Sequence, residues 1–131
     1  GGTTSQIVAR ELGVEVKSST EIYDKEVPPI AYIQGVDLVT EGVLTLSKTI
    51  DRLKSLSKSL DSDIFKAKDG ASQMAKLLYS ASHIKLLVGR SLNIANAESS
   101  FQRDLELRLH VVGELEKILV KLGKIVTVEY Y

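Results

Sequence analysis

The chain has 131 residues, a length typical of one domain with a single hydrophobic core. Its 17 Lys and Arg residues balance its 17 Asp and Glu residues, so no excess positive charge is available to neutralise nucleic-acid phosphates. The absence of cysteine excludes disulfides, thiolate nucleophiles and cysteine-based metal sites. These totals favour a cytoplasmic protein that does not bind nucleic acid.

The apolar runs are too short for a membrane-spanning helix, which needs about 20 residues. One of the longest, Ile84 to Val88, is short and is interrupted by Lys85. We therefore expect no membrane partner. The chain starts at Gly1-Gly2 without an initiator Met, which favours a piece of a longer protein.

The first third of the chain alternates glycine turns with short apolar segments. A glycine turn at Gly1-Gly2 leads into a predicted short helix that Gly13 ends, followed by a short strand at Val14 to Val16. The segment from Ser18 to Pro29 reads as a polar connection, because Pro28-Pro29 cannot lie inside a helix or a central strand. Val36 to Val39 follows as a candidate buried strand.

The middle of the chain has helical periodicity. Apolar residues recur in steps of four and three from Val39 to Leu56, which predicts an amphipathic helix. The Ser- and Lys-rich segment 55–63 is expected to be its polar exit. Asp69 can cap a third helix, whose inward face would carry Ala71, Met74, Ala75, Leu78 and Ala81.

The last third predicts a strand, a loop, a helix and a strand. Ile84 to Val88 is short and mostly apolar, as in a buried strand, and an irregular polar loop is expected from Gly89 to Ser100. A long helix with apolar residues from Leu105 to Leu122 ends at Gly123, and 125–131 forms the final strand.

Helices and strands thus alternate over most of the length. This order predicts a single α/β domain over residues 1–131. The expected architecture is a small, mostly parallel sheet of about four strands with helices packed on its faces, a Rossmann-like three-layer arrangement.

Three junctions combine glycine with hydroxyl or amide side chains where a strand is expected to end. At the carboxyl edge of a parallel sheet, such loops and helix N-termini can bind a phosphate or a carboxylate. Ordinary turn and capping chemistry selects the same residues, and neither the Walker A pattern nor the dinucleotide glycine fingerprint is complete. The candidate ligand-binding residues are Gly1, Gly2, Thr3, Thr4, Thr40, Glu41, Gly42, Gly89, Ser91 and Asn93.

Residues suited to catalysis or metal binding are sparse. Glu41 could act as a general base or bind a cation, with Thr40 or Thr4 nearby, although a Glu at this position commonly just complements the helix dipole. His83 and His110 lack a second ligand at metal-binding spacing and are predicted to be structural. No nucleophile-elbow motif surrounds Ser5 or Ser91. We therefore predict no catalytic residue, no metal ligand and no cofactor in this chain.

Several segments resemble one bacterial family. The stretches 1–13, 28–32 and 35–46, together with Val88-Gly89, Asn93 and the closing Leu122-Gly123-Lys124 plus strand, are similar to the region that follows the catalytic domain of stage II sporulation protein E-like serine/threonine phosphatases. The resemblance covers nearly the whole chain in order and spacing. The family pattern has Asn-x-Ala-His where this chain reads Asn93-Ile94-Ala95-Asn96, which leaves any role of that imidazole unsupported.

The resemblance implies a non-catalytic C-terminal regulatory domain of a bacterial protein phosphatase. In that family an upstream catalytic domain binds Mn²⁺ or Mg²⁺ through aspartates that this chain does not contain. The expected partners are that catalytic domain, a small anionic ligand or a second copy of the chain. Two alternatives remain: a small enzyme that uses Glu41 and Thr40, and an oligomerisation or protein-interaction module that pairs chains through the long helix or the final strand.

Overall fold

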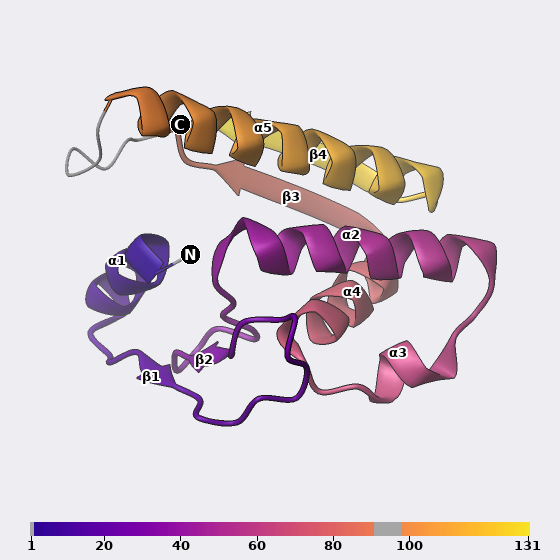
Figure 1. Cartoon of the computed structure of the whole chain (residues 1–131), viewed down its shortest axis with the longest axis horizontal. Coiled ribbons are helices and arrows are strands. Elements are labelled where there is room, and N and C mark those ends of the chain that lie inside the picture. The colour runs from indigo at the N-terminus through magenta and orange to yellow at the C-terminus, as the bar shows by residue number, and fades with distance from the viewer. Residues whose placement is uncertain (1, 91–97) are drawn as a thin grey trace.

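The computed structural model of the chain describes residues 2–90 and 98–131 (Figure 1). In chain order these residues form helix α1 (Gly2–Leu12), strands β1 (Lys17–Ser18) and β2 (Ala31–Tyr32), helices α2 (Gly42–Lys58), α3 (Ser62–Lys66) and α4 (Gly70–Ser80), strand β3 (His83–Val88), helix α5 (Glu98–Lys121) and strand β4 (Ile125–Tyr130). No helix in the described ranges is long and apolar enough to cross a membrane.

The main hydrophobic core forms where α2 packs between α4 and α5 (Figure 1). Leu53 on α2 and Leu119 on α5 are completely buried there. The spacing of three and four residues places the apolar side chains of each helix on one face, and that face turns inward. The buried members of this core are Ile50, Leu53, Leu56, Ile64, Ala75, Ile84, Val111, Leu115, Ile118 and Leu119.

A second, smaller cluster of buried side chains joins α1 to the segments around β2. Ala9, Ile33 and Val39 are its buried members. Val14 and Val16 are partly buried against them. The strand predicted at Val14 to Val16 is wrong, because these valines pack into this cluster from an irregular segment.

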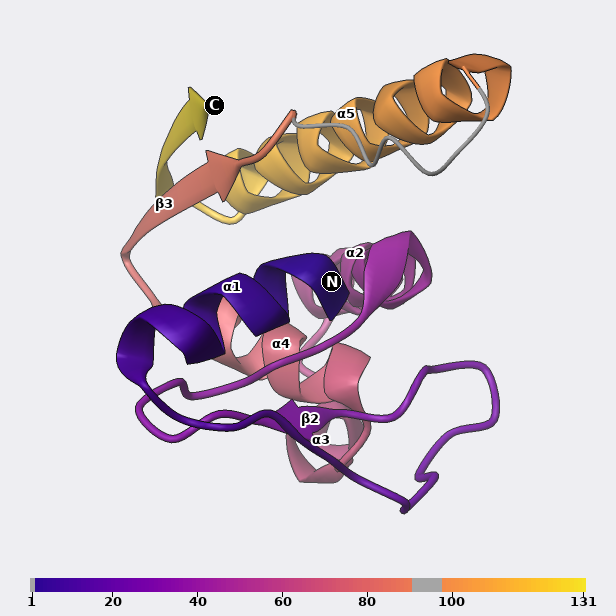
Figure 2. The same cartoon turned by 90° about the vertical axis from the view of Figure 1, so that its left-hand side faces the viewer.

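Strands β3 and β4 form a parallel pair connected through α5. The register runs from His83 opposite Ile125 to Val88 opposite Tyr130. Figure 2 shows α5 on one side of the two strands and no helix on the other. One face of this sheet is therefore packed, and no helix of the described residues covers the other face.

The predicted four-stranded parallel sheet and its three-layer arrangement are wrong. The described strands form two separate two-stranded sheets, β1–β2 antiparallel and β3–β4 parallel. At Gly35 the chain turns with φ +91°, and the Val36 N–H donates to the Ile33 carbonyl at 3.0 Å. Val39 makes only an isolated bridge with Ala31. Because the first half bends back at this turn, it provides no strand long enough to join a parallel sheet.

More of the predicted helices than of the predicted strands are confirmed. The four helices predicted from periodicity and capping correspond to α1, α2, α4 and α5, and Gly13 and Gly123 follow α1 and α5 with φ +68° and +83°. The exit predicted at 55–63 is wrong in part, because α2 continues to Lys58 and the short α3 starts at Ser62. The loop predicted at 89–100 is wrong at its end, because α5 starts at Glu98, and its residues 91–97 lie outside the described residues.

Candidate functional site

The described parts of the three predicted junctions lie on the same side of the molecule. In Figures 1 and 2 the start of α1 lies beside the start of α2, and β3 ends on that side. Gly1, Ser91 and Asn93 lie outside the described residues. Gly2 starts α1, and Thr3 and Thr4 are exposed in its first turn. Two helix N-termini therefore meet where the sequence predicted an anion site.

The residues around the start of α2 have structural partners of their own. Glu41 occupies the N-cap position, yet its exposed side chain makes no capping hydrogen bond. Its backbone carbonyl accepts a hydrogen bond from Thr45 Oγ1 at 2.7 Å. Gly42 has φ +78°, a conformation that favours glycine. Thr40 is partly buried, and its methyl group lies near Gly70. This junction is thus a helix start with one exposed carboxylate.

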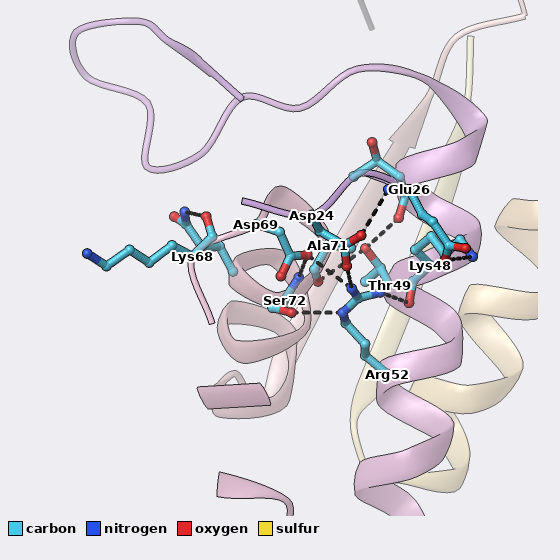
Figure 3. Close-up of polar contacts among 11 residues, drawn as sticks. Asp24, Glu26, Lys48, Thr49, Arg52, Lys68, Asp69, Ala71 and Ser72 are labelled. Carbon is cyan, nitrogen blue, oxygen red and sulfur yellow. Dashed lines mark hydrogen bonds and ion pairs between the residues drawn. The ribbon is translucent and has the colours of Figure 1, made fainter. Parts of the chain in front are cut away.

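The densest polar cluster of the described residues is centred on Arg52 (Figure 3). Its Nε donates to Ser72 Oγ at 2.8 Å, and one terminal nitrogen donates to the Lys48 carbonyl at 3.2 Å. The other terminal nitrogen lies 3.1 Å from Asp24 Oδ2 and 3.3 Å from Asp69 Oδ2. Each guanidinium nitrogen therefore has an acceptor, and the two carboxylates share one positive charge.

The side chains of Arg52 and Asp69 are largely buried. The Asp69 side chain is 6% exposed and that of Arg52 18% exposed. Asp69 also caps α4, because its Oδ2 accepts the Ser72 N–H at 2.9 Å, which confirms the predicted cap. A buried carboxylate needs such partners, since desolvation otherwise destabilises its charge.

The same cluster ties the 18–29 connection to α2. Asp24 comes from this connection and Arg52 from α2. Two residues further on, Glu26 pairs with Lys48 of α2 at 3.0 Å. Two ion pairs one helical turn apart therefore hold the connection against the helix.

An open depression of about 470 Å³ lies beside the cluster. Its lining carries three carboxylates and three cationic side chains, so it offers no net charge to attract an anion. An incoming anion would have to displace Asp24 from Arg52. The lining residues are Tyr23, Asp24, Arg52, Asp63, Ile64, Lys66, Ala67, Lys68, Asp69 and Ser72.

Sequence reasoning identified Asp69 as a cap but missed Arg52, Asp24 and Ser72. The acidic partners of Arg52 come from segments 28 and 17 residues away, and no local spacing signals that they meet. Both histidines are exposed, and the described residues contain no group of three or more His, Cys, Asp or Glu placed to hold a metal. The contacts of the cluster cap α4 and hold the 18–29 connection against α2.

The free edge of β4 is a second candidate surface. Ile125 N–H donates to the Ser82 carbonyl at 3.0 Å and Tyr131 N–H to the Val88 carbonyl at 2.9 Å. Because backbone groups alternate along a strand, those of the odd-numbered residues of β4 point to β3. The N–H and C=O groups of Val126, Val128 and Tyr130 therefore point to the opposite edge, where no described strand pairs with them.

Exposed apolar and aromatic side chains lie on the strand that forms this edge. Ile125 is 59% exposed and Tyr131 66% exposed. Between them, Glu129 accepts a hydrogen bond from Tyr131 Oη at 2.5 Å and pairs with Lys85 of β3 at 3.0 Å. The hydrogen bond from Tyr131, followed by that from Lys85, holds the pKa of Glu129 below its ordinary value. The same contact with Glu129 raises the pKa of Tyr131. The edge strand is thus apolar with its one carboxylate neutralised.

No protein-family model, curated protein or solved structure matches this chain.

Proposed function

We propose that this chain is a non-catalytic interaction module that binds an extended protein segment along the free edge of β4. The observation that carries the proposal is a two-stranded parallel sheet whose outer strand has an unpaired edge and large exposed apolar side chains. Parallel strands are normally paired and covered on both faces, because their apolar residues point both ways. Among the described residues, this sheet has one face without a helix (Figure 2), and the outer edge of β4 has no strand partner.

The chemistry of strand addition fits this edge. A partner strand would hydrogen-bond to the backbone groups of Val126, Val128 and Tyr130, which gives affinity without a particular sequence. Alternate side chains of the partner would lie beside Ile125 and Tyr131, which provides selectivity. Charged side chains commonly protect edge strands from pairing. Here the single carboxylate, Glu129, is engaged by Lys85.

A library of random seven-residue peptides, screened against the immobilised chain, tests this proposal. Bound peptides should be rich in β-branched and aromatic residues and should shift the NMR amide signals of Val126, Val128 and Tyr130. Val128→Pro should abolish binding, because it removes an edge N–H while leaving the N–H groups that face β3. Peptides that bind elsewhere, or binding that survives this substitution, would refute the proposal.

The resemblance of the sequence supports a setting for this module: a regulatory domain in a cytoplasmic bacterial serine/threonine phosphatase. In that setting, the metal-dependent catalytic domain of the same protein is the alternative to a second copy of the chain as the source of the bound segment. If the segment comes from that domain, adding the purified catalytic domain should reproduce the NMR shifts along β4. Shifts confined to other elements would remove the catalytic domain as the partner.

The adjacent N-termini of α1 and α2 favour a second candidate function, binding of a small anionic ligand. Glu41 lies at this place and opposes it, because its carboxylate would repel an anion. Phosphate-bearing metabolites should raise the melting temperature, and Glu41→Gln should enlarge that increase. An unchanged melting temperature for both proteins across the metabolite panel would refute this function.

A further inference from the structure

We infer that the extended segment bound along β4 is the β4 strand of a second copy of this chain, antiparallel, with Val128 facing Val128 across a twofold axis. This inference rests on the proposed function and names its partner. Two features of β4 lead to it: the edge to which each backbone N–H and C=O group points, and the sequence of side chains along the strand.

The backbone limits which registers are possible. Only Val126, Val128 and Tyr130 present N–H and C=O groups to the free edge, by the alternation that the contacts of Ile125 and Tyr131 with β3 establish. In an antiparallel pair, hydrogen-bonded residues lie directly opposite each other. An even-numbered residue must therefore face an even-numbered residue of the other copy. A register centred on Val128 uses all three on each strand.

The side chains in this register complement each other. Val126 faces Tyr130 of the second copy, Ile125 faces Tyr131 and Thr127 faces Glu129. Pairs of aromatic with β-branched residues are among the stabilising cross-strand pairs. Ile125, Tyr130 and Tyr131, which are exposed in the single chain, all gain apolar neighbours. A register centred on Thr127 instead places Ile125 opposite Glu129, and it places Tyr131 opposite Gly123, outside β4.

The charged side chains of the two copies are compatible in this register. Glu129 lies 3.0 Å from Lys85 within its own sheet, so each copy brings a neutral pair to the axis. Across the axis Glu129 meets the hydroxyl of Thr127, and no two like charges are directly opposite. Like charges in such positions would destabilise the pairing.

The twofold symmetry limits the assembly to two copies. Antiparallel pairing about a twofold axis uses the same edge of both copies, so it forms a dimer and not a filament. The product is a four-stranded sheet in the order β3, β4, β4 and β3, with both α5 helices on one face. The free edge of β4, which is the outer edge of the sheet in Figure 2, is thereby paired.

Sedimentation equilibrium of the full chain over a range of concentrations provides the first test. We expect a reversible monomer–dimer equilibrium. Ile125→Glu should raise its dissociation constant at least about tenfold, because a carboxylate would then face an aromatic ring. Tyr131→Lys should weaken the dimer as well, and the double substitution should restore it by pairing opposite charges across the axis. Leu87→Lys, an exposed change on β3 away from the axis, is the matched control and should leave the equilibrium unchanged.

Cysteine cross-linking tests the register independently, because the chain has no cysteine of its own. Val128→Cys should form a covalent dimer under mild oxidation, whereas Thr127→Cys should remain monomeric on a denaturing gel. Cross-linking of Thr127→Cys alone would overturn the register.

A wild-type chain that stays monomeric at all concentrations, yet binds library peptides along β4, would overturn the second copy as the partner and leave the proposed function standing. A dimer that Ile125→Glu and Val128→Pro do not affect would overturn the inference. Circular dichroism of each variant identifies any that fails to fold, and the exposed Ile125 and Tyr131 positions make folded variants the expected result.

Discussion

At the scale of single residues, Arg52 contributes most to holding distant segments together. Arg52→Met keeps much of the aliphatic packing but leaves the buried Asp69 without its cation. We expect a loss of about 2 kcal/mol in the free energy of unfolding, less than for a fully buried pair because Asp24 is partly exposed. Urea denaturation measures this loss.

The matched control is Lys48→Met, which removes the neighbouring ion pair with the exposed Glu26. This substitution should cost less than about 1 kcal/mol, since surface pairs contribute little. Equal losses for the two variants would contradict the central role of Arg52.

Gly70, the first residue of α4, lies close to two β-branched side chains. A Cβ atom there would lie 3.0 Å from a methyl group of Ile30 and 3.1 Å from that of Thr40. Both neighbours are β-branched and stiff, so they yield poorly. Gly70→Ala should therefore destabilise the protein by about 1 kcal/mol, in spite of the better helix propensity of alanine. A raised melting temperature in calorimetry would show that the site relaxes and would contradict this expectation.

At the scale of elements, the two edges of β4 should respond differently to proline. Thr127 N–H points to β3 and belongs to the ladder, whereas Val128 N–H points to the free edge. Thr127→Pro should lower the free energy of unfolding of the monomer by at least about 1 kcal/mol more than Val128→Pro, because it removes a ladder hydrogen bond. Urea denaturation at a concentration low enough to keep both variants monomeric measures the difference. The opposite order would mean that the backbone alternation is misassigned.

At the same scale, the sequence pattern predicted the longer helices and the strands β3 and β4, but it also predicted two strands that do not form. The face of α2 that contains Ile50 and Leu53 follows from spacing within one segment, and so do the cap at Asp69 and the end at Gly123. Val36 to Val39 has the composition of a buried strand, yet a strand exists only if a partner lies beside it. After the turn at Gly35, this segment makes only an isolated bridge, between Val39 and Ala31.

At the scale of the whole molecule, the two clusters of buried side chains should differ in stability. The cluster of Ala9, Ile33 and Val39 is much smaller than the main core around Leu53 and Leu119. We expect native-state hydrogen exchange to show α1 opening at a lower free energy than α2 and α5.

Two substitutions separate the clusters. Ile33→Ala should lower the opening free energy of α1 and leave that of α5 unchanged. Leu119→Ala should lower global stability by about 3 kcal/mol. Uniform exchange of all helices, or equal effects of the two substitutions, would indicate one cooperative unit instead.

The amino-acid sequence by itself determined the four longer helices, their buried faces and several of their ends, because these depend on residues a few positions apart. Tertiary structure alone decided that the strands form two separate pairs and that Asp24 and Asp69 meet at Arg52. It also decided which edge of β4 stays free. Those features depend on contacts between segments far apart in the chain, and local spacing carries no information about which distant segments meet.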